Sequence, residues 1–321
     1  MEFYDSLADV PAGFGPSAVA IGKFDGVHAG HRRIIGELRA VADRDSLEAT
    51  IVTFDRHPLA LLRPESCPPP LVSNDQKVAL LAETGVDATL MLAFDRAFSE
   101  QSPEEFVQRI LVDALHARVV MVGADFRFGS KGSGTVAVLT ELGREHGFEV
   151  LIIDDVVSPE ESHTRRASST WIRELLAEGR VAEAAVVLGH APVVRGVVVK
   201  GAQRGRELGF PTANLSPRNE GFIPGDGVYA AWFTVDGVRY ASAVSIGNNP
   251  TFAGVPEKQV EAHLLDETID LYGKLVEVAF VEYIRGQVKY TTIEALIDQI
   301  ADDVAKVRVV LGQPAPAVAP G

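Results

Sequence analysis

Cysteine is nearly absent from this chain of 321 residues, because Cys67 is the only one. A single thiol excludes an intrachain disulfide and a cysteine-based zinc site. No apolar run approaches the roughly 18 residues that a membrane-spanning helix needs. The first ten residues, MEFYDSLADV, also lack the basic and apolar regions of a signal peptide. We therefore expect a cytoplasmic protein that does not associate with membranes.

Positive charge is also scarce, since 30 Lys and Arg face 44 Asp and Glu and leave a net charge of -14. An acidic chain is a poor partner for nucleic acid, although a small anionic ligand can still be held by local basic groups and backbone amides. The chain is 46% hydrophobic and 23% charged, which is the balance of a globular protein with a core. Its length suits two ordinary domains.

Short apolar runs alternate with helical patterns through the first half. Strands are expected at 17–22, 48–54, 88–94, 117–123 and 148–154, and helices at 31–46, 75–85, 103–116 and 135–147. The strands are near-continuous runs of Val, Ile and Leu, as in a sheet covered on both faces. This order predicts a doubly wound parallel sheet, whose ligands bind at the carboxyl ends of the strands.

The residue pattern changes after a helical stretch at 168–189, which we expect to end the first domain. From Pro192 onward, strand-like runs are broken by Gly, Asn and Asp, with a hairpin signal at Asp236-Gly237. An amphipathic helix is expected at 292–311. These patterns predict an α/β domain at 1–187, an antiparallel β domain at 188–311 and a disordered tail at 312–321.

The stretch IGKFDGVHAGH (21–31) lies at the predicted exit of a strand and leads into a helix. Glycines let the backbone approach a ligand, and a helix N-terminus attracts phosphate. His28 and His31 would stand beside that terminus. An ordinary strand–loop–helix connection with two exposed histidines explains most such pairs equally well. A metal site lacks an evident third ligand.

Two further loops are expected at the same edge of the sheet. GADFRFGSKGSG (123–134) carries Asp125 and Arg127, and RRASSTWIR (165–173) opens a helix with Ser169 and Thr170, followed one turn later by Arg173. Neither contains the spacing of a Walker A loop. Hydroxyl groups at a helix start are usually N-caps, but three polar loops together favour a nucleotide site.

The second half offers two candidate segments. In RGRELGFPTANLS (204–216), Pro211 stiffens a turn beside Thr212 and Asn214, which could equally be capping residues. In VEAHLLDETIDLYG (260–273), Glu261 and His263 share one face of a strand by alternation. Glu261 is then either a solvated side chain or a working base.

The first-half motifs resemble those of the nucleotidylyltransferase superfamily, with GKFDGVHAGH as its (H/T)xGH signature and RRASSTWIR as its SSTxxR element. Together with TFDRHP (53–58) and GADFRFG, they resemble the FMN adenylyltransferase module of bifunctional bacterial riboflavin kinase/FAD synthetases, a Rossmann-like domain. The resemblance implies that His28 and His31 stabilise the α-phosphoryl transition state of ATP and that Ser169, Thr170 and Arg173 hold its leaving phosphates. It further implies ATP-binding loop residues at Gly22, Phe24, Gly26 and Gly30, and flavin-binding residues at Phe54, His57, Pro58, Asp125 and Arg127.

The second-half motifs resemble the riboflavin kinase domain, a β-barrel with a closing helix. The matching segments, in the family's order, are PTAN (211–214), GVYAAW (227–232), SIGNNPTF (245–252), EAHLLD (261–266) and DLYG (270–273). The resemblance implies that Gly205 and Arg206 bind ATP, that Thr212 and Asn214 coordinate Mg²⁺ and phosphates, and that Glu261 is the general base. It also implies a place for Arg285 at the flavin.

The resemblance as a whole implies an enzyme that phosphorylates riboflavin to FMN in its C-terminal domain and adenylylates FMN to FAD in its N-terminal domain. Both reactions would use ATP and Mg²⁺, and the oligomeric state is left open. One alternative keeps a single live activity, and another is a flavin- or nucleotide-binding regulator without turnover. A third is a transferase of the same superfamily with another substrate, which would lack the PTAN domain.

Overall fold

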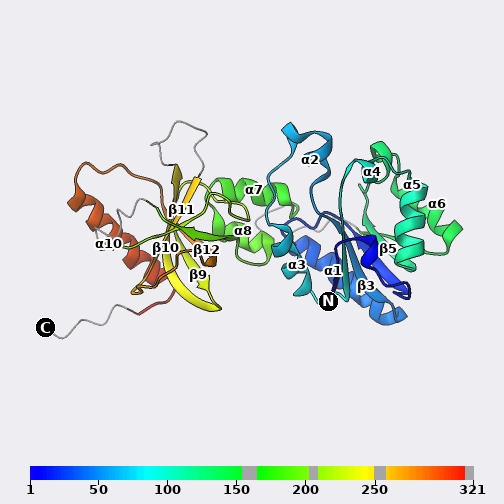
Figure 1. The fold of residues 1–321 in the computed structure, drawn as a ribbon, viewed down its shortest axis with the longest axis horizontal. Coiled ribbons are helices and arrows are strands. Elements are labelled where there is room, and N and C mark those ends of the chain that lie inside the picture. Colours follow the sequence, from blue (N-terminus) through cyan, green and yellow to red (C-terminus); the bar gives the residue numbers. More distant parts are fainter. Residues whose placement is uncertain (154–164, 202–208, 249–257, 315–321) are drawn as a thin grey trace. The chain divides into compact units, whose positions relative to one another are not determined.

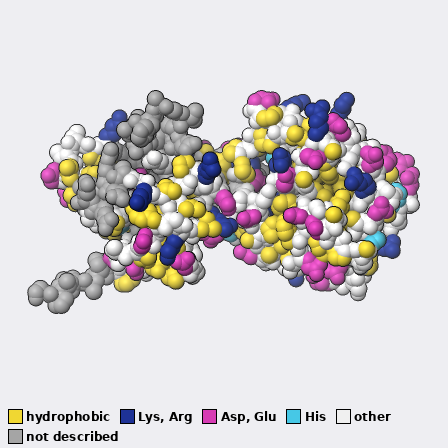
Figure 2. Space-filling model, viewed as in Figure 1, with side chains coloured by type: hydrophobic (Ala, Val, Ile, Leu, Met, Phe, Trp, Pro, Cys, Tyr) yellow, Lys and Arg dark blue, Asp and Glu magenta, His cyan; other side chains and the backbone are white. Residues whose placement is uncertain are grey.

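A computed structural model describes residues 1–153, 165–201, 209–248 and 258–314. The chain forms two compact units, Met1–Ser168 and Ser169–Gly321 (Figure 1). Figure 2 shows acidic and basic side chains interspersed over the visible face, with hydrophobic side chains gathered between them. Among the described helices, none has the length and apolar character needed to cross a bilayer.

The first unit contains a six-stranded parallel sheet with the order β1-β4-β3-β2-β5-β6. Its strands are β1 (Glu2–Tyr4), β2 (Ser17–Ile21), β3 (Glu48–Phe54), β4 (Ala88–Leu92), β5 (Ala117–Gly123) and β6 (Glu149–Ile153). Its α-helices are α1 (Ala29–Asp45), α2 (Pro58–Leu62), α3 (Asn74–Ala82), α4 (Arg96–Ser99), α5 (Pro103–Phe106) and α6 (Val136–His146). The predicted doubly wound parallel sheet is confirmed.

Both faces of this sheet are covered, which explains its continuous apolar strands. One core cluster joins the sheet to α1 and α3, and the other joins it to α5, α6 and the π-helix η3 (Val107–Ala114). The predicted helix at 103–116 is therefore four α-helical residues followed by a π-helix. Strand order reverses at β2, which lies between β3 and β5. Ligands of such sheets bind at the carboxyl ends near that reversal.

The second unit is built around a closed antiparallel barrel with the order β10-β11-β8-β7-β12-β9. Its strands are β7 (Val193–Val199), β8 (Ala213–Leu215), β9 (Gly227–Val235), β10 (Val238–Asn248), β11 (Lys258–Leu264) and β12 (Leu275–Arg285). The predicted Asp236-Gly237 hairpin joins β9 to β10, and both residues have positive φ. Helix α10 (Ile293–Val310) packs its Val307 and Leu311 end on the barrel.

The stretch predicted to be helical at 168–189 contains two helices, α7 (Ser169–Ala177) and α8 (Val181–Leu188). Gly179 turns the chain between them with φ of 79°. A Cβ at position 179 would lie 2.9 Å from the hydroxyl of Tyr229 in the barrel. Both helices thus belong to the second unit, while the domain boundary at 187–188 stays a prediction. Most of the expected tail, from 315 onward, lies outside the described residues.

Candidate functional sites

The loop between β2 and α1, residues 22–28, is called the histidine loop below. It passes three times through the left-handed backbone region, at Phe24 (φ 48°), Gly26 (79°) and Val27 (40°). Phe24 and Val27 are buried, and neither residue type adopts this conformation without cost. Such strain persists only where the surroundings impose it, and it is concentrated at ligand sites. The loop is therefore built for more than connecting two elements.

The two histidines of the (H/T)xGH motif lie together at the start of α1. His28 is the N-cap, and its Nδ1 accepts the backbone N–H of His31 at 3.4 Å. The proton of a neutral His28 ring is consequently on Nε2, which becomes a fixed donor. The two rings stack with centroids 3.7 Å apart.

His31 is kept neutral by its surroundings. Burial lowers the pKa of its imidazole well below the usual 6.5, and the neighbouring His28, Lys23 and Arg166 lower it further. Its Nδ1 is buried and has no hydrogen-bond partner among the described residues. A neutral ring with an unused polar atom suits hydrogen bonding to an incoming anionic group.

The glycines of the motif allow close packing around these rings. A Cβ at Gly30 would lie 3.2 Å from Nδ1 and Cε1 of His28, and one at Gly22 would lie 3.1 Å from the ring of Phe24. The structure thus brings together the predicted loop residues Gly22, Phe24, Gly26 and Gly30 around the two histidines. Their contact with ATP stays a prediction.

The loop after β3, residues 55–57, is called the β3 loop below, and it lies beside the histidine loop. His57 caps α2, because its Nδ1 accepts the backbone N–H of Leu59 at 3.1 Å. Its Nε2 lies 3.3 Å from Nζ of Lys23, and Thr53 donates its hydroxyl to the carbonyl of Lys23 at 3.1 Å. Side chains therefore join the histidine loop to the end of β3, 30 residues away, and to the β3 loop, 34 residues away.

An aromatic cleft of about 510 Å³ opens at the carboxyl ends of β3, β4 and β5. Three predicted flavin-binding residues, Phe54, Pro58 and Arg127, line it, whereas His57 and Asp125 are not part of its lining. Sequence reasoning missed the other phenylalanines of the cleft, which are Phe94, Phe98, Phe106, Phe126 and Phe128. Phe126 and Phe128 stack, and the other neighbouring rings pack edge-on or tilted, with centroids 5.3–6.1 Å apart. A flat aromatic ligand suits such walls.

The SSTxxR residues lie at the start of α7, within the second unit. Helix α7 begins at Ser169, Thr170 is exposed, and Arg173 follows one turn later. Their place beside the histidines stays a prediction.

A row of polar side chains crosses three strands on the outer face of the barrel. Asn214 of β8 stands opposite Glu261 of β11, which in turn stands opposite Ser245 of β10. The neighbours of Glu261, Val260 and Ala262, are buried inside the barrel. Residues directly opposite each other have Cβ atoms about 5 Å apart, so these three can act on one ligand.

His263 shares the face of Glu261, as alternation predicted. It donates from Nδ1 to the carbonyl of Pro211 at 2.9 Å, and burial lowers the pKa of its ring. This bond ties the start of the PTAN segment to β11. The tie keeps Thr212 and Asn214 at a defined place along the strand that carries Glu261.

Asn214 also lies tightly against the backbone of Gly201, since a Cβ there would be 2.4 Å from its Cγ. Thr212 and Asn214 offer oxygen donors beside a carboxylate, which is the chemistry that Mg²⁺ prefers. Within the described ranges no cluster of three His, Cys, Asp or Glu could hold a metal unaided. The predicted ATP residues Gly205 and Arg206 lie outside the described residues.

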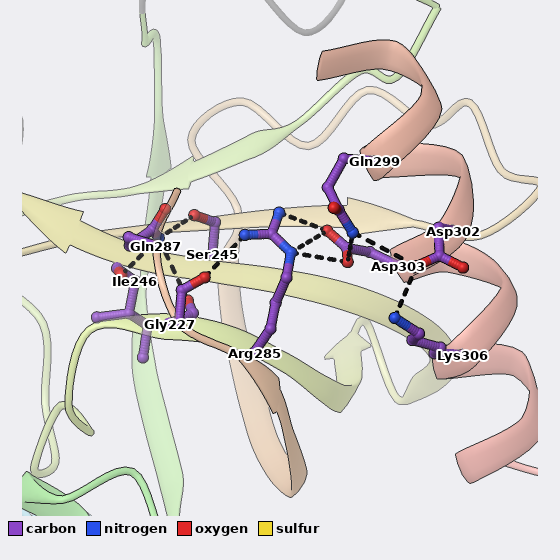
Figure 3. A network of polar contacts seen from close by, with 10 residues as sticks. Gly227, Ser245, Ile246, Arg285, Gln287, Gln299, Asp302, Asp303 and Lys306 are labelled. Atoms are coloured by element: carbon purple, nitrogen blue, oxygen red, sulfur yellow. Dashed lines mark hydrogen bonds and ion pairs between the residues drawn. The ribbon is translucent and has the colours of Figure 1, made fainter. Parts of the chain in front are cut away.

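Arg285, predicted to contact the flavin, is held by helix α10 (Figure 3). Its guanidinium donates to both carboxylate oxygens of Asp303 at 2.7–3.0 Å, and Asp303 is only 3% exposed. Two residues later, Gln287 donates to the hydroxyl of Ser245 at 3.0 Å and to the carbonyl of Ile246 at 2.9 Å. The segment after β12 is therefore fastened to α10 and to the end of the polar row. A flavin contact for Arg285 stays a prediction.

Comparison with known proteins is consistent with two sites on two units. A family model described as FAD synthetase matches residues 12–170, and one described as riboflavin kinase matches residues 188–311. The bifunctional riboflavin kinase/FMN adenylyltransferase of Listeria monocytogenes is 35% identical over 89% of each chain. Its Escherichia coli counterpart is 36% identical over 93% of this chain and 94% of its own. This chain belongs to the bifunctional riboflavin kinase/FMN adenylyltransferase family.

The FAD synthetase match holds the histidine loop, the β3 loop and the aromatic cleft, and it ends at residue 170 inside α7. The riboflavin kinase match holds the whole barrel and α10. A solved structure from Streptococcus pneumoniae, named a macrolide-efflux protein, is similar in fold with a TM-score of 0.84. It is 30% identical, and the likeness covers 95% of this chain and 98% of that one.

Proposed function

We propose that this bifunctional riboflavin kinase/FMN adenylyltransferase makes FAD in two steps at two separate sites. The barrel transfers the γ-phosphoryl group of ATP to riboflavin and releases FMN and ADP. The first unit transfers the adenylyl group of a second ATP to FMN and releases FAD and pyrophosphate. The observation that carries the proposal is that each family match has its own built constellation: the stacked histidines in one and the Asn214–Glu261–Ser245 row in the other.

In the kinase step, Glu261 takes the proton of the ribityl 5′-hydroxyl of riboflavin. The hydroxyl oxygen attacks the γ-phosphorus of ATP at the same time. A base is needed because an alcohol is a poor nucleophile at neutral pH. Glu261 projects from the outer face of the barrel beside Asn214, so base and phosphate ligand are adjacent. Thr212 and Asn214 would hold Mg²⁺, which when bound neutralises phosphate charge.

In the adenylyl step, a phosphate oxygen of FMN attacks the α-phosphorus of ATP and pyrophosphate leaves. The nucleophile is already ionised, so no strong base is required. Catalysis then rests on positioning and on charge stabilisation. His28 supplies a donor fixed on Nε2, and the neutral ring of His31 supplies a second polar group in a buried place. Ser169, Thr170 and Arg173 are proposed to hold the leaving phosphates.

The flavin ring is proposed to occupy the aromatic cleft. Its lining of phenylalanines next to Pro58 and Arg127 offers apolar walls for the isoalloxazine and a cation for an anionic group. The cleft lies at the carboxyl edge of the sheet, where the histidine loop also begins. FMN and ATP would thus meet at the reversal of strand order.

The proposal is tested by incubating the pure protein with riboflavin, ATP and Mg²⁺ and separating the flavins by chromatography. Both FMN and FAD are expected. Formation of FMN without FAD would support the kinase activity alone. Formation of neither flavin would contradict the enzyme assignment. Omitting Mg²⁺ and adding a chelator should stop both steps.

The assignment of sites is tested with one variant of each. Glu261→Gln should lower FMN formation by about 10²–10⁴-fold, the usual contribution of a general base, and leave conversion of supplied FMN to FAD intact. His28→Ala should do the reverse. Glu277→Gln, an exposed glutamate on β12, is the matched control and should change neither rate. Loss of both activities in either site variant would contradict separate sites.

A further inference from the structure

A lysine that the reaction described above does not use is buried beneath the adenylyl site. Lys77 of α3 is only 7% exposed, and its Nζ donates to the backbone carbonyl of Phe54 at 2.6 Å. Phe54 is the last residue of β3, directly before the β3 loop. A lysine is rarely buried unless its charge has partners, because the desolvation cost is large.

The partners of this charge come from the two loops of the adenylyl site. Asp25 belongs to the histidine loop and Asp55 to the β3 loop, and both carboxylates favour the charged form of Lys77. Asp25 accepts the backbone N–H of Leu71 at 2.9 Å. Each carboxylate thus fixes a piece of backbone, and its negative charge acts on the ammonium group.

Asp55 extends the same arrangement to the next strand. Its Oδ1 accepts the backbone N–H of Phe94 at 2.8 Å, just beyond β4, and its Oδ2 pairs with Arg56 at 2.7 Å. Phe94 and Phe54 both line the aromatic cleft. The lysine therefore stands where the histidine loop, the β3 loop and a wall of the cleft come together.

We propose that Lys77 is a positioning residue for adenylyl transfer. Its ammonium group fixes the carbonyl of Phe54 at the end of β3, where the β3 loop and a wall of the flavin cleft begin, and its charge balances the nearby carboxylates of Asp25 and Asp55. Without the cation the carbonyl of Phe54 would lose its donor, and the two carboxylates would lose a compensating charge. The inference rests on the proposed adenylyl transfer in the first unit.

The charge state of Lys77 gives a test that separates positioning from a merely structural role. Burial lowers its pKa to about 8, with Asp25 and Asp55 opposing that shift. The other charges of these loops are Arg56, which pairs with Asp55, and Lys23 of the histidine loop. As pH rises through about 8, Lys77 loses the charge that strengthens its bond to Phe54 and balances the two carboxylates, so the rate of adenylyl transfer falls.

Stability is expected to change in the opposite direction over the same range. The ordinary pKa of lysine is 10.5, so between about pH 8 and 10.5 the unfolded chain binds more protons at this residue than the folded chain does. By linkage, the Lys77 contribution to the free energy of unfolding then rises with pH. A rate that falls while the thermal stability measured at the same pH is steady or rising cannot be explained by unfolding.

The experiment measures kcat and KM for FAD formation from FMN and ATP between pH 7 and 10, with thermal unfolding recorded at each pH. The proteins are wild type, Lys77→Met, Lys77→Arg and the control Asp75→Asn, an exposed charge on the same helix. FMN formation from riboflavin is measured in the same samples as an internal reference. At pH 7, Lys77→Met should lower kcat for FAD formation about 10- to 100-fold, as expected for a small misplacement of reacting groups.

Three results together would support the inference. Lys77→Met should form FMN at the wild-type rate, and its FAD formation should no longer change near pH 8. Lys77→Arg should recover part of the FAD formation and keep it at pH 9. A wild-type kcat for FAD formation in Lys77→Met would overturn the inference. A Lys77→Met profile that changes near pH 8 as the wild-type profile does would also overturn it. If Lys77→Met fails to fold, the wild-type and Lys77→Arg profiles still decide, because equal decline of both above pH 8 would overturn it. Wild-type protein that makes no FAD would instead overturn the proposed function.

Discussion

Replacing Gly201 with alanine is the sharpest test of the kinase site, because the change is small and its geometric effect can be worked out. The added Cβ would lie 2.4 Å from Cγ of Asn214, whereas carbon atoms in contact rest about 3.5 Å apart. The amide of Asn214 must therefore move by about 1 Å. Displacement of that size at a reacting centre costs on the order of 10²-fold in rate, or about 2.7 kcal/mol of transition-state stabilisation.

Stability should change little in Gly201→Ala, because the clash involves the end of a side chain and not the backbone. Losing a glycine restricts the unfolded chain, which offsets part of any strain by about 0.4–1 kcal/mol. FMN formation is measured by chromatography, with conversion of supplied FMN to FAD as the internal reference. Gly36→Ala is the matched control, since a Cβ there meets nothing within 4 Å. A wild-type kinase rate in Gly201→Ala would refute the assigned role of Asn214.

Three further outcomes are expected. Gly30→Ala should lower the rate of adenylyl transfer several-fold, because the added Cβ displaces the His28 ring. The higher helix propensity of alanine should add up to about 1 kcal/mol of stability. Rate measurements check the first effect and melting curves the second. Arg285→Met leaves the buried carboxylate of Asp303 without its cation and should lower the free energy of unfolding by about 3–5 kcal/mol. The double variant Arg285→Met, Asp303→Leu should recover most of this loss, and urea unfolding measures both. Because the pKa of His31 is lowered, the unfolded chain binds a proton below pH 6.5 that the folded chain does not, so stability should fall as pH drops below 6.5; this slope should be flatter in His31→Asn.

The fold could be predicted where local pattern and tertiary environment agree. Strand β3 was predicted with the observed limits, because an apolar run in a doubly covered sheet has no competing pattern. The break at Gly179 was not predicted, since apolar periodicity continues on both sides of it. Gly179 turns the chain there at a positive φ, and the hydroxyl of Tyr229 leaves no room for a side chain, a contact that sequence spacing does not contain.

The candidate sites divide in the same way. Residues in dense motifs, such as His28 and Glu261, could be proposed from sequence because their types and spacing are unusual. The phenylalanines of the cleft could not, because scattered apolar residues normally indicate core. Lys77 was missed because a lysine on an amphipathic helix usually faces water, and only its burial and its bond to the carbonyl of Phe54 make it notable.

The aromatic cleft has an optical consequence. Its lining among the described residues includes six phenylalanines and no tyrosine or tryptophan. Phenylalanine is much harder to oxidise than either of those residues, so it does not readily pass an electron to a photoexcited isoalloxazine. A flavin resting between these walls would keep most of its emission. Its arrival in the first unit would then be visible as slowed tumbling in fluorescence anisotropy, without loss of brightness.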